Sequence, residues 1–179
     1  MADYHTPIEI LGYRDEWPAL FEDERSRLRE EVGDQTIAIE HFGSTSVPGL
    51  AAKPIIDICP VVPDMSAAHA CKPALLDLGY QFNAERENWL AFERYDGSSQ
   101  QYNVHLHPRG STRLERILLF RDYLRDHSHA RAAYAAAKRH AAAVHPNDTS
   151  AYNDAKDDIA ECLVTAARET GYEPIIDDG

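Results

Sequence analysis

The chain has few cysteines and few lysines, and it lacks an apolar run long enough to cross a bilayer. Its three cysteines, Cys59, Cys71 and Cys162, are odd in number and have no CxxC spacing, which argues against a disulfide framework or a zinc ribbon and favours buried free thiols. Residues 1–5 lack the basic and apolar regions of a signal peptide. We therefore expect a soluble cytoplasmic protein that does not associate with membranes.

Cationic residues are outnumbered in this chain. The 18 lysines and arginines stand against 30 aspartates and glutamates, which gives a formal net charge of −12, and lysine occurs only at positions 53, 72, 138 and 156. Nonspecific nucleic-acid binding depends on clustered Lys and Arg that neutralise phosphates. The composition therefore argues against a nonspecific nucleic-acid binder, although it leaves room for a local basic pocket.

The apolar pattern predicts a sheet followed by helices, and 179 residues with 44% hydrophobic content suit one domain. Strands are expected at 8–11, 36–42, 55–62, 89–95 and 102–107, and the last two flank a turn signal at 96–99 and form a hairpin. Helices are expected at 16–32, 66–78, 112–126, 128–144 and 148–169. This order indicates an α/β (α+β) architecture with a mixed sheet and a helical C-terminal part. We expect residues 1–172 to form the domain and 173–179 a frayed tail.

The segment from Glu40 to Ile58, EHFGSTSVPGLAAKPIIDI, predicts a strand, a tight loop and a second strand. The glycine of Gly43-Ser44 lets backbone N–H groups approach a ligand without a side chain between, which suits a phosphate. Lys53 would add a point charge beside this loop. A turn that only connects two strands is the alternative. The loop is neither a Walker A loop, which needs Gly-Lys followed by Ser or Thr, nor a GxSxG nucleophile elbow.

Asp57 is the one carboxylate of the apolar run 55–62. Burial of an ionised aspartate costs free energy unless the group is paired, hydrogen-bonded or bound to a metal. Asp57 is therefore either a structural anchor for the loop or a functional group, and we interpret it as functional.

His105 and His107 alternate on the strand 102–107, so both imidazoles project from one face. With Asp57 on a neighbouring strand they would form a two-histidine, one-carboxylate set, which favours a transition metal over magnesium. The alternative is that one histidine is a satisfied core residue and the other hydrogen-bonds a phosphate or Asp57. We predict that the Gly43-Ser44 loop, Asp57 and both histidines face one cavity.

Two tyrosine–lysine pairs lie in the last two predicted helices. Tyr134 with Lys138, and Tyr152 with Lys156, are spaced i, i+4, so each pair shares a helix face and the two faces could line one pocket. A solvated lysine whose stem packs on the ring is the alternative.

Arg121 has the same spacing to Arg125 in the helix 112–126. Both guanidinium groups could hold anionic groups bidentately, or they could form salt bridges to Asp122 or Asp126 on adjacent turns.

The segment GSTSVPGLAAKPIIDI resembles the GrpB-like family of the nucleotidyltransferase superfamily. Members of this family occur as separate proteins or as an appended domain of dephospho-coenzyme A kinases. The resemblance extends over most of the chain and includes Trp17-Pro18, His105-Leu106-His107 and FRDYLR at 120–125. It implies a nucleotidyltransferase fold with a pocket for a nucleotide or another phosphorylated small molecule. Together with the residue patterns, it predicts catalytic roles for Asp57, His105 and His107, and ligand contacts from Gly43, Ser44, Thr45, Ser46, Lys53, Arg121, Tyr134, Lys138, Tyr152 and Lys156.

The sequence departs from the superfamily at one position. Nucleotidyltransferases of this fold typically hold a divalent metal with an Asp-x-Asp pattern, and here Cys59 stands at the second position, where a neutral thiol is a poor ligand for magnesium. Glu93 is the candidate replacement carboxylate. Three functions stay open: transfer of a nucleotidyl or phosphoryl group with Mg, Mn or Zn, a non-catalytic ligand-binding module, and a hydrolase that uses a metal held by Asp57 and the histidines. The sequence does not indicate an oligomeric state.

Overall fold

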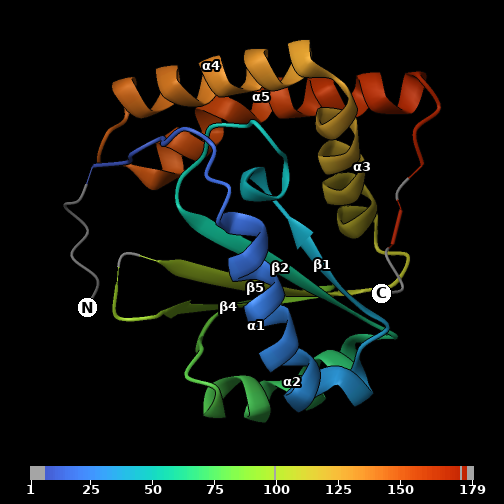
Figure 1. The fold of residues 1–179 in the computed structure, drawn as a ribbon. Helices are drawn as coiled ribbons and strands as arrows, with labels where there is room; N and C mark the ends of the chain where they lie inside the picture. The colour runs from blue at the N-terminus through green and yellow to red at the C-terminus, as the bar shows by residue number, and fades with distance from the viewer. Residues whose placement is uncertain (1–6, 99, 174, 177–179) are drawn as a thin grey trace.

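A five-stranded mixed sheet forms the middle layer of the protein (Figure 1). The structure is a computed structural model that describes residues 7–98, 100–173 and 175–176. Its strands are β1 (Ala38–Phe42), β2 (Ile55–Val62), β3 (Gln81–Arg86), β4 (Trp89–Tyr95) and β5 (Gln101–Pro108). Their order is β1-β2-β5-β4-β3, with β2 and β5 parallel and the other neighbours antiparallel. The predicted mixed-sheet α/β (α+β) class is confirmed.

Two helices cover one face of the sheet and a third covers the other. α1 (Trp17–Val32) and α2 (Met65–Asp77) share a core cluster with Ile58 of β2. α3 (Thr112–Asp126) packs on the opposite face, in a cluster with the next residue, Cys59, because neighbouring strand residues point to opposite faces. The side chain of Ser111 caps α3 by accepting a hydrogen bond from Leu114 N at 3.2 Å.

The last two helices pack on the β1–β2 loop. α4 (Ser128–Val144) and α5 (Thr149–Glu169) lie along each other at the top of Figure 1, above this loop. Val47 and Leu50 of the loop share an apolar cluster with residues of both helices. α5 begins after Asp148, whose carboxylate accepts a hydrogen bond from Ala151 N at 2.9 Å. The helices that carry the tyrosine–lysine pairs therefore pack on the loop that was predicted to bind a ligand.

The local predictions differ from the structure at two places. The expected strand 8–11 is a single bridge between Leu11 and Ala52. β3 was not predicted, because most of its residues are exposed and polar. Most of the expected frayed tail, 173–179, lies outside the described residues, and within it Ile175 is hydrogen-bonded to Arg121 and Asp122 of α3. The predicted hairpin of β4 and β5 is confirmed.

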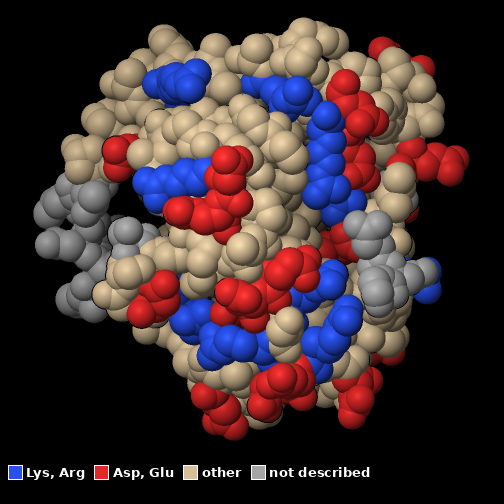
Figure 2. All heavy atoms as spheres, viewed as in Figure 1, with Lys and Arg blue, Asp and Glu red and all other residues tan. Residues whose placement is uncertain are grey.

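Figure 2 shows acidic and basic side chains interspersed over one face of the molecule, with no continuous basic surface on that face. Among the residues that the structure describes, no helix has the length and apolar character needed to cross a membrane.

Arg121 joins α3 to β1 in the protein interior. The side chains of Arg121 and Glu40 are each 2% exposed and form an ion pair. Arg121 also binds Asp122 through Nε at 2.7 Å and donates to the carbonyl oxygens of His41 at 3.3 Å and Ile175 at 3.0 Å. Because these acceptors engage the whole guanidinium, Arg121 fastens the helical layer to the sheet.

We predict that Arg121→Met lowers the free energy of unfolding by about 3 to 5 kcal/mol, because it leaves the Glu40 carboxylate buried without its partner. Arg116→Met is the matched control on the same helix, since Arg116 pairs with Glu161, whose side chain is 60% exposed. The control should lose less than about 1 kcal/mol. Urea unfolding followed by circular dichroism measures both, and equal losses would contradict this account of Arg121.

Candidate functional site

Gly43, at the end of β1, is the point where the loop backbone comes closest to Asp57. Its φ of 69° and ψ of −172° lie in a region that is essentially restricted to glycine. A Cβ atom at this position would lie 2.3 Å from Asp57 Oδ2. The glycine therefore has a specific purpose, because it lets the backbone pass directly over the carboxylate. The loop then makes a short 3-10 turn, Ser44–Ser46.

Asp57 is held by a neighbour on the adjacent strand. Asn103 of β5 lies beside Asp57 of β2 in the parallel register and donates from Nδ2 to Asp57 Oδ1 at 3.2 Å. Desolvation raises the pKa of Asp57 to about 6, although Asn103 and three lysines oppose that rise. The carboxyl group is therefore mostly ionised at neutral pH, and its pKa is close enough to neutrality for it to accept a proton. Asn103 was not predicted, because its place beside Asp57 follows only from the strand register.

Lys138 of α4 closes the site from above. Its Nζ donates to Ser44 Oγ at 2.8 Å and to the carbonyl oxygen of Ala51, and the residue is only 2% exposed. Burial, helped by the charges of Lys156, Arg139 and Lys53, lowers the pKa of Lys138 to about 7. The contact confirms that α4 reaches the Gly43–Ser46 loop.

Lys53 and Lys156 approach the same carboxylate from two other elements. Lys53 Nζ lies 5.1 Å and Lys156 Nζ 5.4 Å from the centre of the Tyr152 ring. Burial lowers the pKa of both lysines. The charge of Asp57 opposes this shift at Lys53, and the charges of Asp157 and then Asp57 oppose it at Lys156. Tyr134 has a similar position under Lys138, whose Nζ lies 4.8 Å from its ring centre. Both predicted tyrosine–lysine pairs therefore face one site.

The predicted histidines belong to a different environment. The strand register places Asp57, His105 and His107 on one face of the sheet, but the imidazoles contact aromatic rings. His105 lies 5.1 Å and His107 5.8 Å from the Trp89 ring, between centroids. Burial lowers the pKa of His105 to about 4 and that of His107 to about 3. Both imidazoles are therefore neutral at physiological pH.

No metal-binding group of three His, Cys, Asp or Glu side chains occurs among residues 7–98, 100–173 and 175–176. The expected metal set of Asp57, His105 and His107 is therefore not assembled. His107 is completely buried, and neither of its ring nitrogens has a hydrogen-bond partner among the described residues. Packing against tryptophan accounts for the position of the pair better than a shared metal does.

The two other positions that were considered for a second carboxylate are also unsuited. Cys59 is completely buried in an apolar cluster with Leu114 and Leu118 of α3, and burial raises the pKa of its thiol. Glu93 of β4 pairs with Asn103, so β5 separates it from Asp57. Neither position therefore places a second carboxylate beside Asp57.

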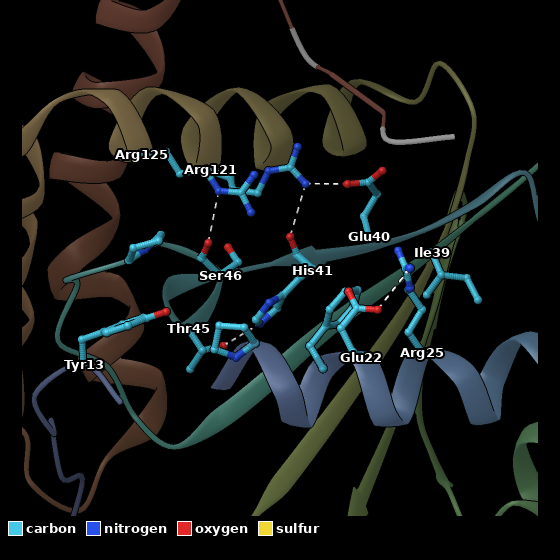
Figure 3. A pocket seen from close by; sticks show the side chains of 13 residues that line it. Tyr13, Glu22, Arg25, Ile39, Glu40, His41, Thr45, Ser46, Arg121 and Arg125 are labelled. Carbon is cyan, nitrogen blue, oxygen red and sulfur yellow. Dashed lines mark hydrogen bonds and ion pairs between the residues drawn. The ribbon is translucent and has the colours of Figure 1, made fainter. Parts of the chain in front are cut away.

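Thr45, Ser46 and Arg121 line a cavity of about 410 Å³ between α1, α3 and the edge of β1, which Figure 3 shows. Thr45 Oγ1 donates to the carbonyl oxygen of Ile55 at 2.9 Å, so His41 Nε2 donates to Thr45 at 3.1 Å. Thr45 and Arg121 are therefore engaged within the protein. The predicted ligand-binding residues thus fall into two groups, of which Gly43, Ser44, Lys53, Tyr134, Lys138, Tyr152 and Lys156 gather around Asp57.

The charge of the Asp57 site is opposite to that of the whole chain. Three of the four lysines in a protein of net charge −12 interact electrostatically with Asp57, and of these Lys156 also interacts with Asp157. An excess of cations around the buried Lys138 attracts anions, and a backbone glycine with a serine hydroxyl beside it offers further contacts. The arrangement is suited to hold a phosphate group.

Comparisons with known proteins agree over nearly the whole chain. The profile of the family described as GrpB protein matches residues 7–165. A UPF0157 protein of Halalkalibacterium halodurans is 36% identical over 170 residues, which cover 95% of this chain and 87% of that protein. A dephospho-CoA kinase of Mycolicibacterium paratuberculosis is 30% identical over an alignment of 198 positions, gaps included. The alignment covers 94% of this chain and 49% of the kinase.

Two solved structures are similar in fold. The crystal structure of GrpB from Enterococcus faecalis has a TM-score of 0.81 at 28% identity and covers 90% of this chain and 98% of that one. A structure of the Cid1 poly(U) polymerase with Mg 3′-dATP bound has a TM-score of 0.51 at 16% identity and covers 72% of this chain and 41% of the polymerase. The second likeness shows a nucleotidyltransferase-like fold and nothing about activity.

We predict that Gly43→Ala lowers the free energy of unfolding by at least about 1 kcal/mol more than Gly49→Ala does. Gly49 also has a positive φ, 80°, but a Cβ atom there meets nothing within 4 Å. The difference between the variants therefore isolates the collision with Asp57. Chemical denaturation of both variants measures it, and equal losses would show that the loop can move away from the carboxylate.

A second prediction concerns the pH dependence of stability. Because the folded-state pKa of Asp57 is raised from 3.8 to about 6, its stabilising contribution is present below pH 3.8 and is lost as the pH rises through 6. At pH 8, Asp57→Asn should therefore have a free energy of unfolding about 1 to 2 kcal/mol higher than that of wild type. The difference should shrink towards pH 4, and denaturant unfolding at both pH values measures it. A wild type that is the more stable form at pH 8 would refute the raised pKa.

Proposed function

The chain belongs to the GrpB protein family, and we propose that its Asp57 site recognises the phosphate of a nucleotide or of another phosphorylated small molecule. Two observations support this proposal: Lys138 contacts Ser44 of the loop, and Lys53, Lys138 and Lys156 all interact electrostatically with Asp57 beside it. Phosphate oxygens accept charge-assisted hydrogen bonds from ammonium groups, and an anion between the lysines relieves their mutual repulsion. The ligand is a small molecule, since the three lysines gather at one place rather than along a surface: Lys138 is buried, and Lys53 and Lys156 are half-buried.

Transfer of a nucleotidyl group is the chemistry that the fold favours. In this site Asp57 is the group that can accept a proton from an attacking hydroxyl, because Asn103 orients it and its pKa of about 6 leaves it ionised at neutral pH. The hydroxyl oxygen would bond to the α-phosphorus as the bond to the departing pyrophosphate breaks, and the lysines would stabilise the charge that develops on the phosphoryl and pyrophosphate oxygens. Catalysis would then rest mainly on positioning and electrostatics.

A non-catalytic binding module is the second candidate, and Cys59 is the observation that favours it. The position of the second carboxylate in an Asp-x-Asp pattern is sealed under α3 by Leu114 and Leu118. The residues around Asp57 do not fit a divalent cation, so no step of transfer is assigned to one. A fold that keeps the phosphate site without this carboxylate suits ligand recognition more than rapid turnover.

Calorimetric titration with nucleoside triphosphates and coenzyme A precursors tests recognition. We expect Lys53→Ala and Lys138→Met to weaken binding by about tenfold to a hundredfold, because each removes a charge-assisted contact. Lys72→Ala is the control, since Lys72 lies over the Phe82 ring at 3.8 Å, in α2, away from the site. Equal effects at all three positions would refute a specific phosphate site.

Assays with labelled nucleoside triphosphates separate the two candidates. The binding module predicts ligand affinity without labelled product, in wild type and in Asp57→Asn alike. Turnover that Asp57→Asn abolishes, with the fold intact by circular dichroism, would establish the transferase and assign Asp57 to catalysis.

A further inference from the structure

We propose that the Asp57 site takes its phosphate-bearing ligand as a metal-free anion, with Lys53, Lys138 and Lys156 supplying the positive charge that a divalent cation would otherwise supply. This inference rests on the proposed function and specifies the form of the ligand. It differs from the chemistry named for the Cid1 structure, in which magnesium accompanies 3′-dATP.

The donor atoms around Asp57 are the first reason. Asn103 directs its amide nitrogen, not its oxygen, towards the carboxylate. The Ser44 hydroxyl oxygen already accepts a hydrogen bond from Lys138. Magnesium requires an octahedral set of oxygen ligands and is usually held by carboxylates, and here a single carboxylate stands among hydrogen-bond donors.

The charge balance is the second reason. Asp57 interacts electrostatically with Lys53, Lys156 and Lys138, so a divalent cation at its oxygens would be repelled by these lysines in a partly buried site. Salt screens buried charges weakly, and the repulsion would therefore persist at physiological ionic strength. The same field favours a multiply charged anion.

The lysines are also not committed to structural ion pairs. Every ion pair among the described residues joins a carboxylate to an arginine or a histidine. Lys138 instead donates to a hydroxyl and a carbonyl, and Lys53 and Lys156 both lie near the Tyr152 ring. Cations in such a cluster that form no ion pair at contact distance are placed to receive an anion from outside.

Inorganic tripolyphosphate is the probe, because it carries the phosphate chain without a base. Calorimetry of the full chain should show binding in EDTA, with an affinity that excess magnesium leaves unchanged or weakens, since the metal neutralises the anion before it meets the lysines. The double variant Lys53→Ala/Lys156→Ala should bind at least about tenfold more weakly in EDTA, and Lys72→Ala should bind like wild type.

Two outcomes overturn the inference and can be told apart. Binding that is at least about tenfold tighter with magnesium, and is lost in Asp57→Asn, would show that a metal at Asp57 supplies the positive charge. The inference would then be wrong, while the proposed function would stand. Failure to bind tripolyphosphate, nucleotides or coenzyme A precursors, with or without magnesium, would remove the phosphate site itself. A titration with Mn²⁺ alone, followed by electron paramagnetic resonance, provides a second readout, in which wild type and Asp57→Asn should bind the ion equally weakly.

Discussion

The buried ion pair between Arg121 and Glu40 determines where the C-terminal helices lie. It fixes α3 against the edge strand β1, and α4 and α5 follow α3 along the chain and pack on the loop that β1 leads into. Together with the apolar cluster around Val47 and Leu50, this pair places the helices that carry Lys138 and Lys156 near Asp57. A buried pair of this kind contributes more to geometry than to net stability, since desolvation offsets most of its attraction.

Arginine and lysine have separate tasks in this protein. Arginines make nearly all the ion pairs, and their planar guanidinium suits bidentate contacts with carboxylates such as that of Arg121 with Asp122. Three of the four lysines lie near Asp57 and interact with it electrostatically. Because an ammonium group is a compact charge whose pKa responds to burial, it can adjust its protonation when an anion enters or leaves, which a guanidinium cannot do.

Features that depend on local sequence could be predicted, and features that depend on register could not. Gly43 beside a strand end, and the i, i+4 spacing of Tyr152 and Lys156, point to a ligand site from a few neighbouring residues. The strand period also places His105 on the face of Asp57, but it does not predict that His105 packs against the Trp89 ring. The contact of Asn103 with Asp57 spans 46 positions and that of Arg121 with Glu40 spans 81, so neither is visible without the fold.

The separation of the contacts along the chain has a consequence for folding. Asp57 receives its hydrogen bond from β5, and Ser44 receives one from α4 at a distance of 94 positions. During synthesis the strand–loop–strand segment therefore emerges long before the residues that complete the recess. Such nonlocal contacts form late, after the entropy of closing long loops has been overcome. A ligand that needs the lysines can consequently engage only a chain whose helical part is already in place, which makes binding a signal that folding is complete.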